Sequence, residues 1–250
     1  MIIKLFNKIR LLVCAIETRA SIYFTLLSAV YLTLTAYDAN SMDLKLGVSE
    51  GNSGALRYVD QKFNGALADK YTCVIENTEL NWSIRVLPQA RILHNLRNGE
   101  LDAGIPLAHG KDRDVYAEFS STIFDAPFYL YTNEELSMQD DFSGLVFGTL
   151  RASFNVDLIN QRNAKALELN EYMQAIKMTR LGRIDGVVIP APVVSSFSEE
   201  VLKEMTKHAF GSQPAGIYIS KKAPRHKHIL EKINVAINAC LKLSQPIKTK

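Results

Sequence analysis

The chain has 250 residues, of which 47% are hydrophobic, and its formal net charge is +3. Residues 1–36 contain four of the 29 Lys and Arg residues and one of the 26 Asp and Glu residues, so 25 of each charge remain beyond them. This balance gives no reason to expect nucleic acid or an acidic surface as a partner, and the apolar content is sufficient for a sizeable core.

The first residues predict a secretory signal peptide over 1–36 and therefore a periplasmic location. Four basic residues and Glu17 precede or flank an apolar run of fifteen uncharged residues, Ile22–Ala36, and small residues stand at Ala36 and Ala39. Such a run is too short to span a bilayer comfortably. An uncleaved anchor stays open as the alternative, because Glu17 interrupts the leader. No second segment is long enough to cross a membrane.

The next segment alternates expected strands and helices. Residues 43–49 predict a strand, 50–54 a polar turn, and the residues through about Tyr71 a helix. Residues 73–87 are strand-like, and Pro88 opens a helix. Ala90, Leu93 and Leu96 follow at steps of three residues, which predicts a buried stripe on that helix.

The middle of the chain carries the most informative pattern. A helix end at Asn98-Gly99 leads into an apolar strand, 101–107, and then into a polar turn that contains Arg113. A second apolar run begins at Phe119-Ser120, and residues 123–132 are long enough to leave one domain and enter another.

The remaining elements repeat this order of helix end, glycine, acidic residue and apolar strand in Leu181–Ile189. The pattern predicts an α/β fold in two similar lobes. The expected elements are a strand at 144–150, a helix from Ser153 to about Asn163, a helix at 170–181, a strand at 209–220 and a helix at 223–243 with a face of Ile229, Ile233, Ile237 and Cys240.

The pattern Leu96-x-x-Gly99-x-x-Asp102, followed by Arg113 six residues before Phe119-Ser120, resembles the solute-binding proteins of family 3. The resemblance implies the two-lobed type II periplasmic binding protein fold, with a mixed sheet in each lobe and a ligand cleft between them. We expect residues 40–128 with 211–250 to form lobe 1 and residues 129–210 to form lobe 2.

In this family, an arginine at the position of Arg113 clamps the ligand's α-carboxylate, beside the strand end at Ala108. A planar guanidinium matches a carboxylate in two parallel hydrogen bonds, which gives the role a physical basis. The alternative is a solvated turn with local ion pairs over residues 111–114. His109 lies next to this position, where a lone histidine is usually a surface group.

Other candidate ligand-binding residues are Ser49 and Asn52 in the first turn, where the family often has an aromatic lid, and Gln89 at a helix start. Ser49 and Asn52 fit turn and cap chemistry equally well. Ala152 and Ser153 stand where the family holds the carboxylate from the second lobe, at a helix amino terminus that suits an anion.

Pro190 occupies the place of an aspartate that pairs with the ligand's ammonium group in amino-acid binders of the family. Proline offers neither charge nor N–H. The resemblance therefore implies a carboxylate that lacks the amine, or an amine held elsewhere.

We find no catalytic, metal or cofactor motif, and we expect a binding protein rather than an enzyme. The resemblance implies a small-molecule ligand, an ABC permease as partner and a monomer. Two alternatives stay open: an extracytoplasmic sensing or orphan binding domain, and an enzyme on the same scaffold, like the cyclohexadienyl dehydratases. The spacing of Cys73 and Cys240 does not decide whether they pair.

Overall fold

The computed structural model describes residues 43–52, 54–138 and 141–243. The predicted signal peptide at 1–36 lies outside these residues. Within them, nine strands form one sheet in the order β4-β1-β5-β11-β7-β10-β8-β9, with β6 paired to β11. A separate hairpin is formed by β2 and β3.

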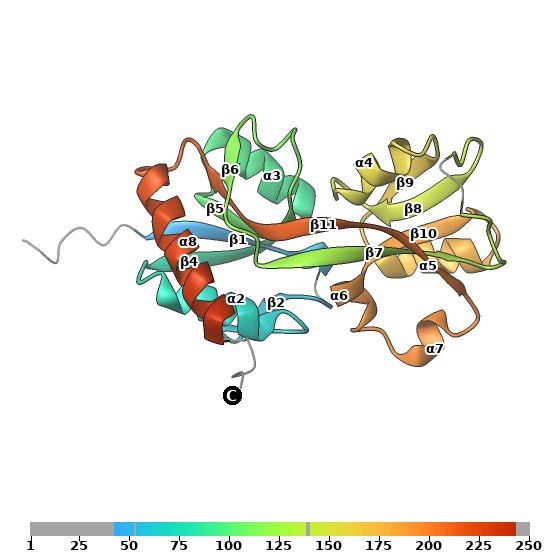
Figure 1. Cartoon of the computed structure of the whole chain (residues 1–250), viewed down its shortest axis with the longest axis horizontal. Helices are drawn as coiled ribbons and strands as arrows, with labels where there is room; N and C mark the ends of the chain where they lie inside the picture. Colours follow the sequence, from blue (N-terminus) through green and yellow to red (C-terminus); the bar gives the residue numbers. More distant parts are fainter. Residues whose placement is uncertain (1–42, 53, 139–140, 244–250) are drawn as a thin grey trace, which may run out of the picture. The chain divides into compact units, whose positions relative to one another are not determined.

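Two long antiparallel strands, β7 (Phe124–Thr132) and β11 (Thr206–Ser220), run through the middle of this sheet (Figure 1). They pair along the whole of β7, and β11 then continues beside β5 and β6 (Ala117–Phe119). The register of the pair shifts before Gly211, which has a φ of +142° that favours glycine. The two strands therefore connect the two ends of the sheet.

The first strand group consists of β1 (Leu44–Ser49), β4 (Trp82–Leu87) and β5 (Ala103–Ala108), which are parallel. The helices that connect them are α2 (Ala68–Asn77) and α3 (Gln89–Asn98). Parallel strands need such crossover connections. Their shared direction places the carboxyl ends of all three strands at one edge of the sheet.

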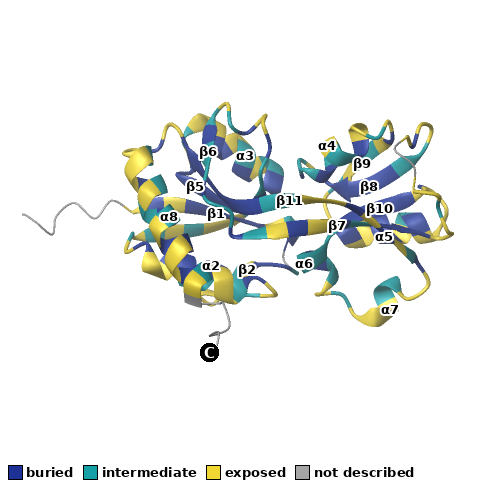
Figure 2. Cartoon of the chain, viewed as in Figure 1, coloured by how far each residue is buried: buried dark blue, intermediate teal, exposed yellow. Residues whose placement is uncertain are grey.

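The second strand group consists of β8 (Val146–Leu150), β9 (Lys165–Leu169) and β10 (Gly186–Pro190), again parallel. It joins β7 through an antiparallel pair between β10 and β7. The helices that accompany this group are α4 (Asn155–Asn160), α5 (Tyr172–Arg180), α6 (Ala191–Val194) and α7 (Glu199–Leu202). The inner strands β1, β5, β8 and β10 are mostly buried, whereas the edge strands β4 and β9 contain only half-buried and exposed residues, and the outer faces of the helices are exposed (Figure 2).

Helix α8 (His226–Leu243) packs against α2 at the end of the first strand group. Its predicted apolar face is confirmed, since Ile229, Ile233 and Ile237 are buried. Cys73 of α2 and Cys240 of α8 form a disulfide bond, with 1.98 Å between their sulfur atoms, which settles the pairing that the spacing left open. None of the described helices is long and apolar enough to span a membrane.

The helix expected from residue 55 to about Tyr71 is wrong in its first part. The structure has the 3₁₀ turn η1 (Glu50–Asn52) and then a hairpin of β2 (Arg57–Val59) and β3 (Lys62–Asn64). Asp60 and Gln61 adopt positive φ in its two-residue turn, and the Tyr58 and Phe63 rings pack across the strands. A turn of this kind matches the twist of the strands.

Three further expectations need correction. Residues 73–77 belong to α2 rather than to a strand, because the apolar face of α2 and Cys73 pack against α8. The buried face of α3 contains Gln89, Ile92 and Leu96, whereas Ala90 and Leu93 are half-buried. Helix α4 starts at Asn155 and ends at Asn160, since strand β9 follows.

Candidate ligand-binding site

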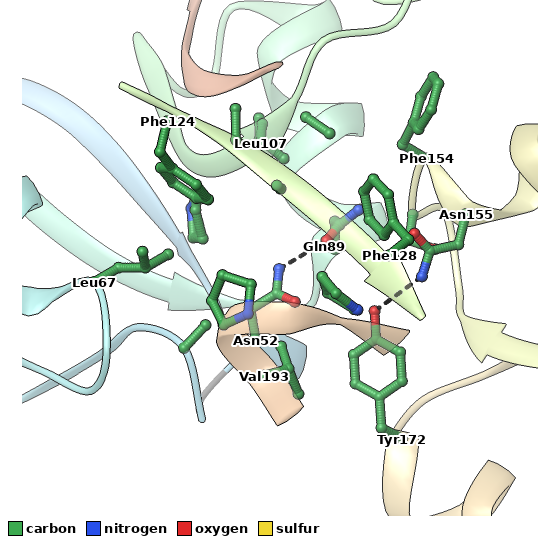
Figure 3. A pocket seen from close by; sticks show the side chains of 18 of the residues that line it. Asn52, Leu67, Gln89, Leu107, Phe124, Phe128, Phe154, Asn155, Tyr172 and Val193 are labelled. Carbon is green, nitrogen blue, oxygen red and sulfur yellow. Dashed lines mark hydrogen bonds between the residues drawn. The ribbon is translucent and has the colours of Figure 1, made fainter. Parts of the chain in front are cut away.

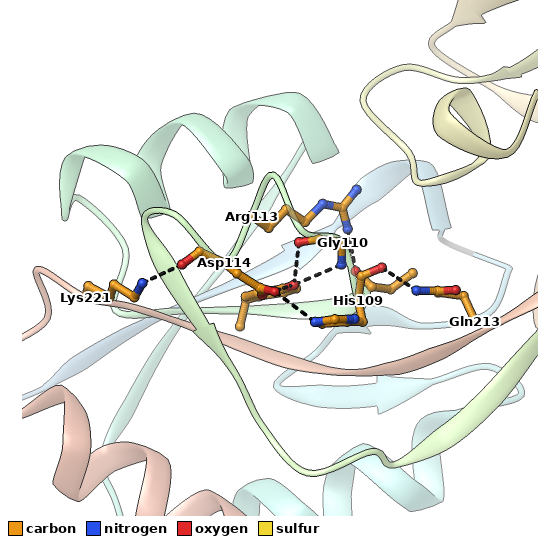
Figure 4. A network of polar contacts seen from close by, with 8 residues as sticks. His109, Gly110, Arg113, Asp114, Gln213 and Lys221 are labelled. Carbon is orange, nitrogen blue, oxygen red and sulfur yellow. Dashed lines mark hydrogen bonds and ion pairs between the residues drawn. The ribbon is translucent and has the colours of Figure 1, made fainter. Parts of the chain in front are cut away.

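The turn that follows β5 is fixed to strand β11 by hydrogen bonds (Figure 4). The Gly110 N–H donates to the Tyr218 hydroxyl at 3.0 Å, and the Gln213 amide donates to the His109 carbonyl at 2.9 Å. Asp114 accepts from the Tyr218 hydroxyl at 2.9 Å and lies 3.0 Å from the His109 ring nitrogen Nε2. These contacts tie the turn that contains Arg113 to strand β11.

Burial raises the pKa of Tyr218 well above its ordinary value, with the adjacent Asp114 carboxylate adding to the effect. The hydroxyl therefore stays protonated and serves as a hydrogen-bond donor to Asp114. His109 packs against the Phe119 and Tyr218 rings rather than facing the cavity described below. The expectation of a solvated turn at residues 111–114 holds for Lys111 and Asp112, which are exposed.

Arg113 itself is buried, with only 3% of its surface exposed. One terminal nitrogen, Nη1, donates to the Ala108 carbonyl at 2.7 Å, and Nη2 donates to the Ala152 carbonyl at 3.2 Å. The Nε nitrogen is buried without a hydrogen-bond partner. Among the described residues, no carboxylate forms an ion pair with this guanidinium. A buried positive charge without an anion is costly.

Asn52, Gln89 and Ala152 form a second connection between the two strand groups, of which Figure 3 shows the hydrogen bond between Asn52 and Gln89. The Asn52 amide donates to Ser49 Oγ at 3.3 Å and to Gln89 Oε1 at 3.1 Å. The Gln89 amide donates to the Ala152 carbonyl at 2.8 Å. The Ala152 carbonyl thus accepts hydrogen bonds from two side chains of the first strand group.

The backbone at Ala152 explains how its carbonyl reaches both donors. Its φ is +56°, in the left-handed region that costs a residue with a Cβ about 1 kcal/mol. The Ala152 N–H donates in the other direction, to Glu168 at 2.9 Å. The strained conformation therefore turns the carbonyl toward Arg113 and Gln89.

Asn52, Gln89 and Arg113 line a cavity of about 60 Å³, part of whose wall is drawn in Figure 3. The polar residues in its wall are Asn52, Gln89, Arg113, Ser153, Asn155 and Tyr172. The large apolar residues in its wall are Leu67, Leu107, Phe124, Phe128, Phe154 and Val193. The wall combines residues from both strand groups and from the connecting strand β7.

Asn155 and Tyr172 form a fixed polar corner in this wall. The Asn155 amide donates to Thr149 Oγ1 at 2.9 Å and to the Val188 carbonyl at 3.0 Å, and its nitrogen lies 3.4 Å from the Tyr172 hydroxyl. Burial raises the pKa of Tyr172 far above its ordinary value, so its hydroxyl remains protonated. This corner is neutral and its amide donors are engaged within the second strand group.

A wider groove of about 1360 Å³ adjoins the cavity. The two share Gln89, Tyr172 and Val193 as lining residues. Gln89 and its hydrogen bonds therefore stand between the inner cavity and the groove.

Solved structures with the same arrangement of elements were found. The arginine-, lysine- and histidine-binding protein ArtJ from Geobacillus stearothermophilus is 15% identical, over 81% of this chain and 90% of its own, with a TM-score of 0.67. The substrate-binding protein of an amino acid ABC transporter is 16% identical, over 81% and 94%, with a TM-score of 0.67. The ligand-binding core of GluR0, in complex with L-glutamate, is 20% identical, over 82% and 95%, with a TM-score of 0.68. No family model and no curated protein sequence matches the chain.

The chain has the type II periplasmic binding protein fold. The two-lobed α/β architecture expected from the sequence is thereby confirmed. In this fold the first lobe is built on the first strand group, the second lobe on the second strand group, and the cavity lies between them.

The structure brings together most of the candidate residues in this binding-protein fold. Those that line the cavity are Asn52, Gln89, Ala108, Arg113, Ser153 and Pro190. Ser49 and Ala152 do not line it, but they accept hydrogen bonds from residues that do. Contact of any of these residues with a ligand stays a prediction.

The predicted helix start at Ser153 needs correction, whereas its role as an anion seat stays a prediction. Helix α4 begins two residues later, at Asn155, and no side chain caps it. The Ser153 N–H donates to the Leu150 carbonyl at 3.1 Å, and its hydroxyl lies 3.3 Å from Thr149 Oγ1. Ser153 lies in the cavity wall directly before α4, and its carbonyl accepts from the Val156 N–H at 3.2 Å.

Sequence reasoning missed the apolar wall of the site. Phe124, Ala126 and Phe128 stand at every second position of β7, and all three line the cavity. Alternating residues of a strand share one face, so this spacing was the available signal. Among the described residues, no group of three or more side chains suited to holding a metal ion was found.

Proposed function

We propose that this chain is a solute-binding protein that captures a small carboxylate-bearing ligand between its two lobes. The observation that carries the proposal is the buried Arg113 guanidinium, which faces the cavity with an unpaired Nε and without an anionic partner among the described residues. A ligand carboxylate would supply that partner in the two-pronged geometry that guanidinium groups favour.

Binding would operate through separation and closure of the lobes, for which we propose the boundaries 40–128 with 211–250 and 129–210. The cavity of about 60 Å³ is small beside the roughly 300–1,000 Å³ of most ligand sites, so entry requires the lobes to part. The bonds from Arg113 and Gln89 to the Ala152 carbonyl would break, and a ligand that bridges both lobes would favour the closed state.

We propose that the protein acts in the periplasm and delivers its ligand, as a monomer, to an ABC permease. The predicted signal peptide supports this location, and so does the disulfide between Cys73 and Cys240, because disulfides persist in oxidising compartments. The likeness to a substrate-binding protein of an amino acid ABC transporter supports the transport role.

A sensing domain is the second candidate, favoured by the likeness to the GluR0 ligand-binding core. It would use the same cavity and the same closure. Binding without catalysis is supported by the likeness to binding proteins and to a ligand-binding core.

A thermal-shift screen of amino acids, amines, dicarboxylates and keto acids tests the proposal. We expect compounds with a carboxylate to raise the melting temperature and simple amines to leave it unchanged. The Arg113→Met variant should lose this response, whereas Lys111→Met should keep it, because Lys111 is an exposed cation of the same turn. A response that survives in Arg113→Met would remove the guanidinium from the site.

A further inference from the structure

We propose that the cavity selects a carboxylate that has no α-ammonium group and carries an apolar substituent next to the carboxylate, rather than a zwitterionic amino acid. This inference rests on the proposed function and names the class of ligand for the same site. It follows from the charges, hydrogen-bond acceptors and apolar groups around Arg113.

The charges in the wall are unbalanced. Among the described residues that line the cavity, Arg113 is charged, and Lys, Asp, Glu and His are absent. A zwitterion brings one negative and one positive charge, but the wall offers a partner only for the negative one. Burying an ammonium group without an anionic partner is costly.

Acidic residues near the cavity are committed elsewhere or exposed. Asp114 faces His109 and the Tyr218 hydroxyl, and Glu168 accepts from the Ala152 N–H. Asp112 and Asp157 are exposed and do not line the cavity. Glu50 and Glu171 line the adjoining groove and are exposed, so no carboxylate stands in the described wall of the cavity beside Arg113.

The position of an α-ammonium group is fixed by covalent geometry. Its nitrogen is bonded to the carbon that carries the carboxylate, so it must lie beside the group that Arg113 holds. The two carbonyls that accept from the guanidinium, at Ala108 and Ala152, are neutral and would leave the positive charge of an ammonium group unbalanced. Pro190 and Pro192, which line the cavity on the second lobe, carry no polar side-chain group.

The rest of the wall is complementary to an apolar substituent. Leu107, Phe124 and Phe128 line the cavity from the first lobe and the connecting strand, and Val193 closes it from α6. Removing an apolar group from water against such a surface is favourable. A CH₂ group next to the ligand carboxylate would therefore fit against this wall, whereas a carbon that carries an ammonium group would not.

Three compounds that share a 3-methylbutyl skeleton test the inference: 4-methylpentanoate, leucine, which adds the α-ammonium group, and 3-methylbutylamine, which lacks the carboxylate. We expect titration calorimetry on the purified protein to give an affinity for 4-methylpentanoate at least tenfold higher than for leucine, and no detectable binding of the amine. A second set of 3-phenylpropanoate, phenylalanine and 2-phenylethylamine covers a larger side chain.

The Pro190→Asp variant tests the cause, because it adds a carboxylate to the wall. Pro190 is the amino-terminal cap of α6 with extended backbone angles, a position that Asp tolerates well. We expect the leucine-to-acid affinity ratio to rise at least tenfold in Pro190→Asp and to stay unchanged in the neutral Pro190→Asn control. If Pro190→Asp does not fold, the affinities of the unaltered protein alone decide.

The outcomes separate this inference from the proposed function. Leucine or phenylalanine binding as tightly as the matching acid would overturn the inference and leave a solute-binding protein. Binding of the amines alone, or of none of the six compounds, would overturn both the inference and the carboxylate-binding role of Arg113.

Discussion

Replacing Arg113 with Met separates the cost of its buried charge from its use in ligand binding. Methionine keeps an unbranched stem of similar reach but removes the guanidinium. The variant loses two hydrogen bonds from a charged donor to the Ala108 and Ala152 carbonyls, each worth about 1.5–3 kcal/mol. The variant also removes a buried charge that has no ionic partner, and this saves the several kcal/mol that its desolvation costs.

The two effects on the ligand-free protein nearly cancel. We expect the free energy of unfolding of Arg113→Met to stay within about 2 kcal/mol of the unaltered protein. The effect on a bound carboxylate has no such compensation, since removing one partner of a buried ion pair costs about 3–5 kcal/mol. This corresponds to a loss of affinity of about two to more than three orders of magnitude.

Urea unfolding and calorimetric titration with 4-methylpentanoate measure the two quantities separately. Arg113→Lys provides the matched comparison, because it keeps the charge but not the planar fork, and we expect an intermediate affinity. A variant that binds the acid within tenfold of the unaltered protein would refute the reasoning. So would a ligand-free Arg113→Met protein that does not fold, because the guanidinium would then serve the fold.

Three further predictions concern other parts of the structure. Reducing the Cys73–Cys240 disulfide, or replacing both residues with Ser, should lower the free energy of unfolding by about 2–5 kcal/mol, and equal melting temperatures of reduced and oxidised protein would contradict this. Ala152→Gly should raise the free energy of unfolding by about 0.5–1 kcal/mol in urea titrations by relieving the positive φ, and a loss of stability would show that the strain is absent. Partial desolvation and then the Asp112 charge raise the pKa of Asp157, so Asp112→Asn should lower that pKa in an NMR titration. Because the folded pKa is raised, the stability that Asp157 contributes is complete below its unfolded-state pKa and is lost as the pH rises through the folded value. An unchanged pKa of Asp157 in Asp112→Asn would exclude repulsion between the two carboxylates.

The parts of the fold that sequence alone predicts are those set by local patterns. The face of α8 that contains Ile229, Ile233 and Ile237 follows from helical periodicity, and the structure buries it. The position of Arg113 after β5 follows from the order of helix end, strand and turn. Both depend on residues that are close together in the sequence.

The hairpin of β2 and β3 was missed because its turn, Asp60-Gln61, lacks the glycine that usually signals positive φ. The disulfide and the apolar wall were beyond prediction for another reason. Cys73 and Cys240 are 167 residues apart, and Phe124 meets Val193 at the cavity only after the chain has folded. Contacts of this kind depend on the packing of whole elements.

The candidate site shows the same division. Arg113 and Gln89 were predicted as polar groups near a cleft, but their shared acceptor, the Ala152 carbonyl, was not. That contact depends on a left-handed backbone at a residue with a Cβ, which sequence patterns disfavour. The helix expected to begin at Ser153 starts later for a related reason, because the turn at Ala152 occupies the chain before it.

The central claim is that the Arg113 guanidinium receives a ligand carboxylate between the lobes. A crystal structure of the protein with 4-methylpentanoate tests it most directly. We predict both carboxylate oxygens within hydrogen-bond distance of Arg113, with Nε as one donor and the present 3.2 Å bond from Nη2 to the Ala152 carbonyl broken. A carboxylate bound away from Arg113, with that bond intact, would contradict the account.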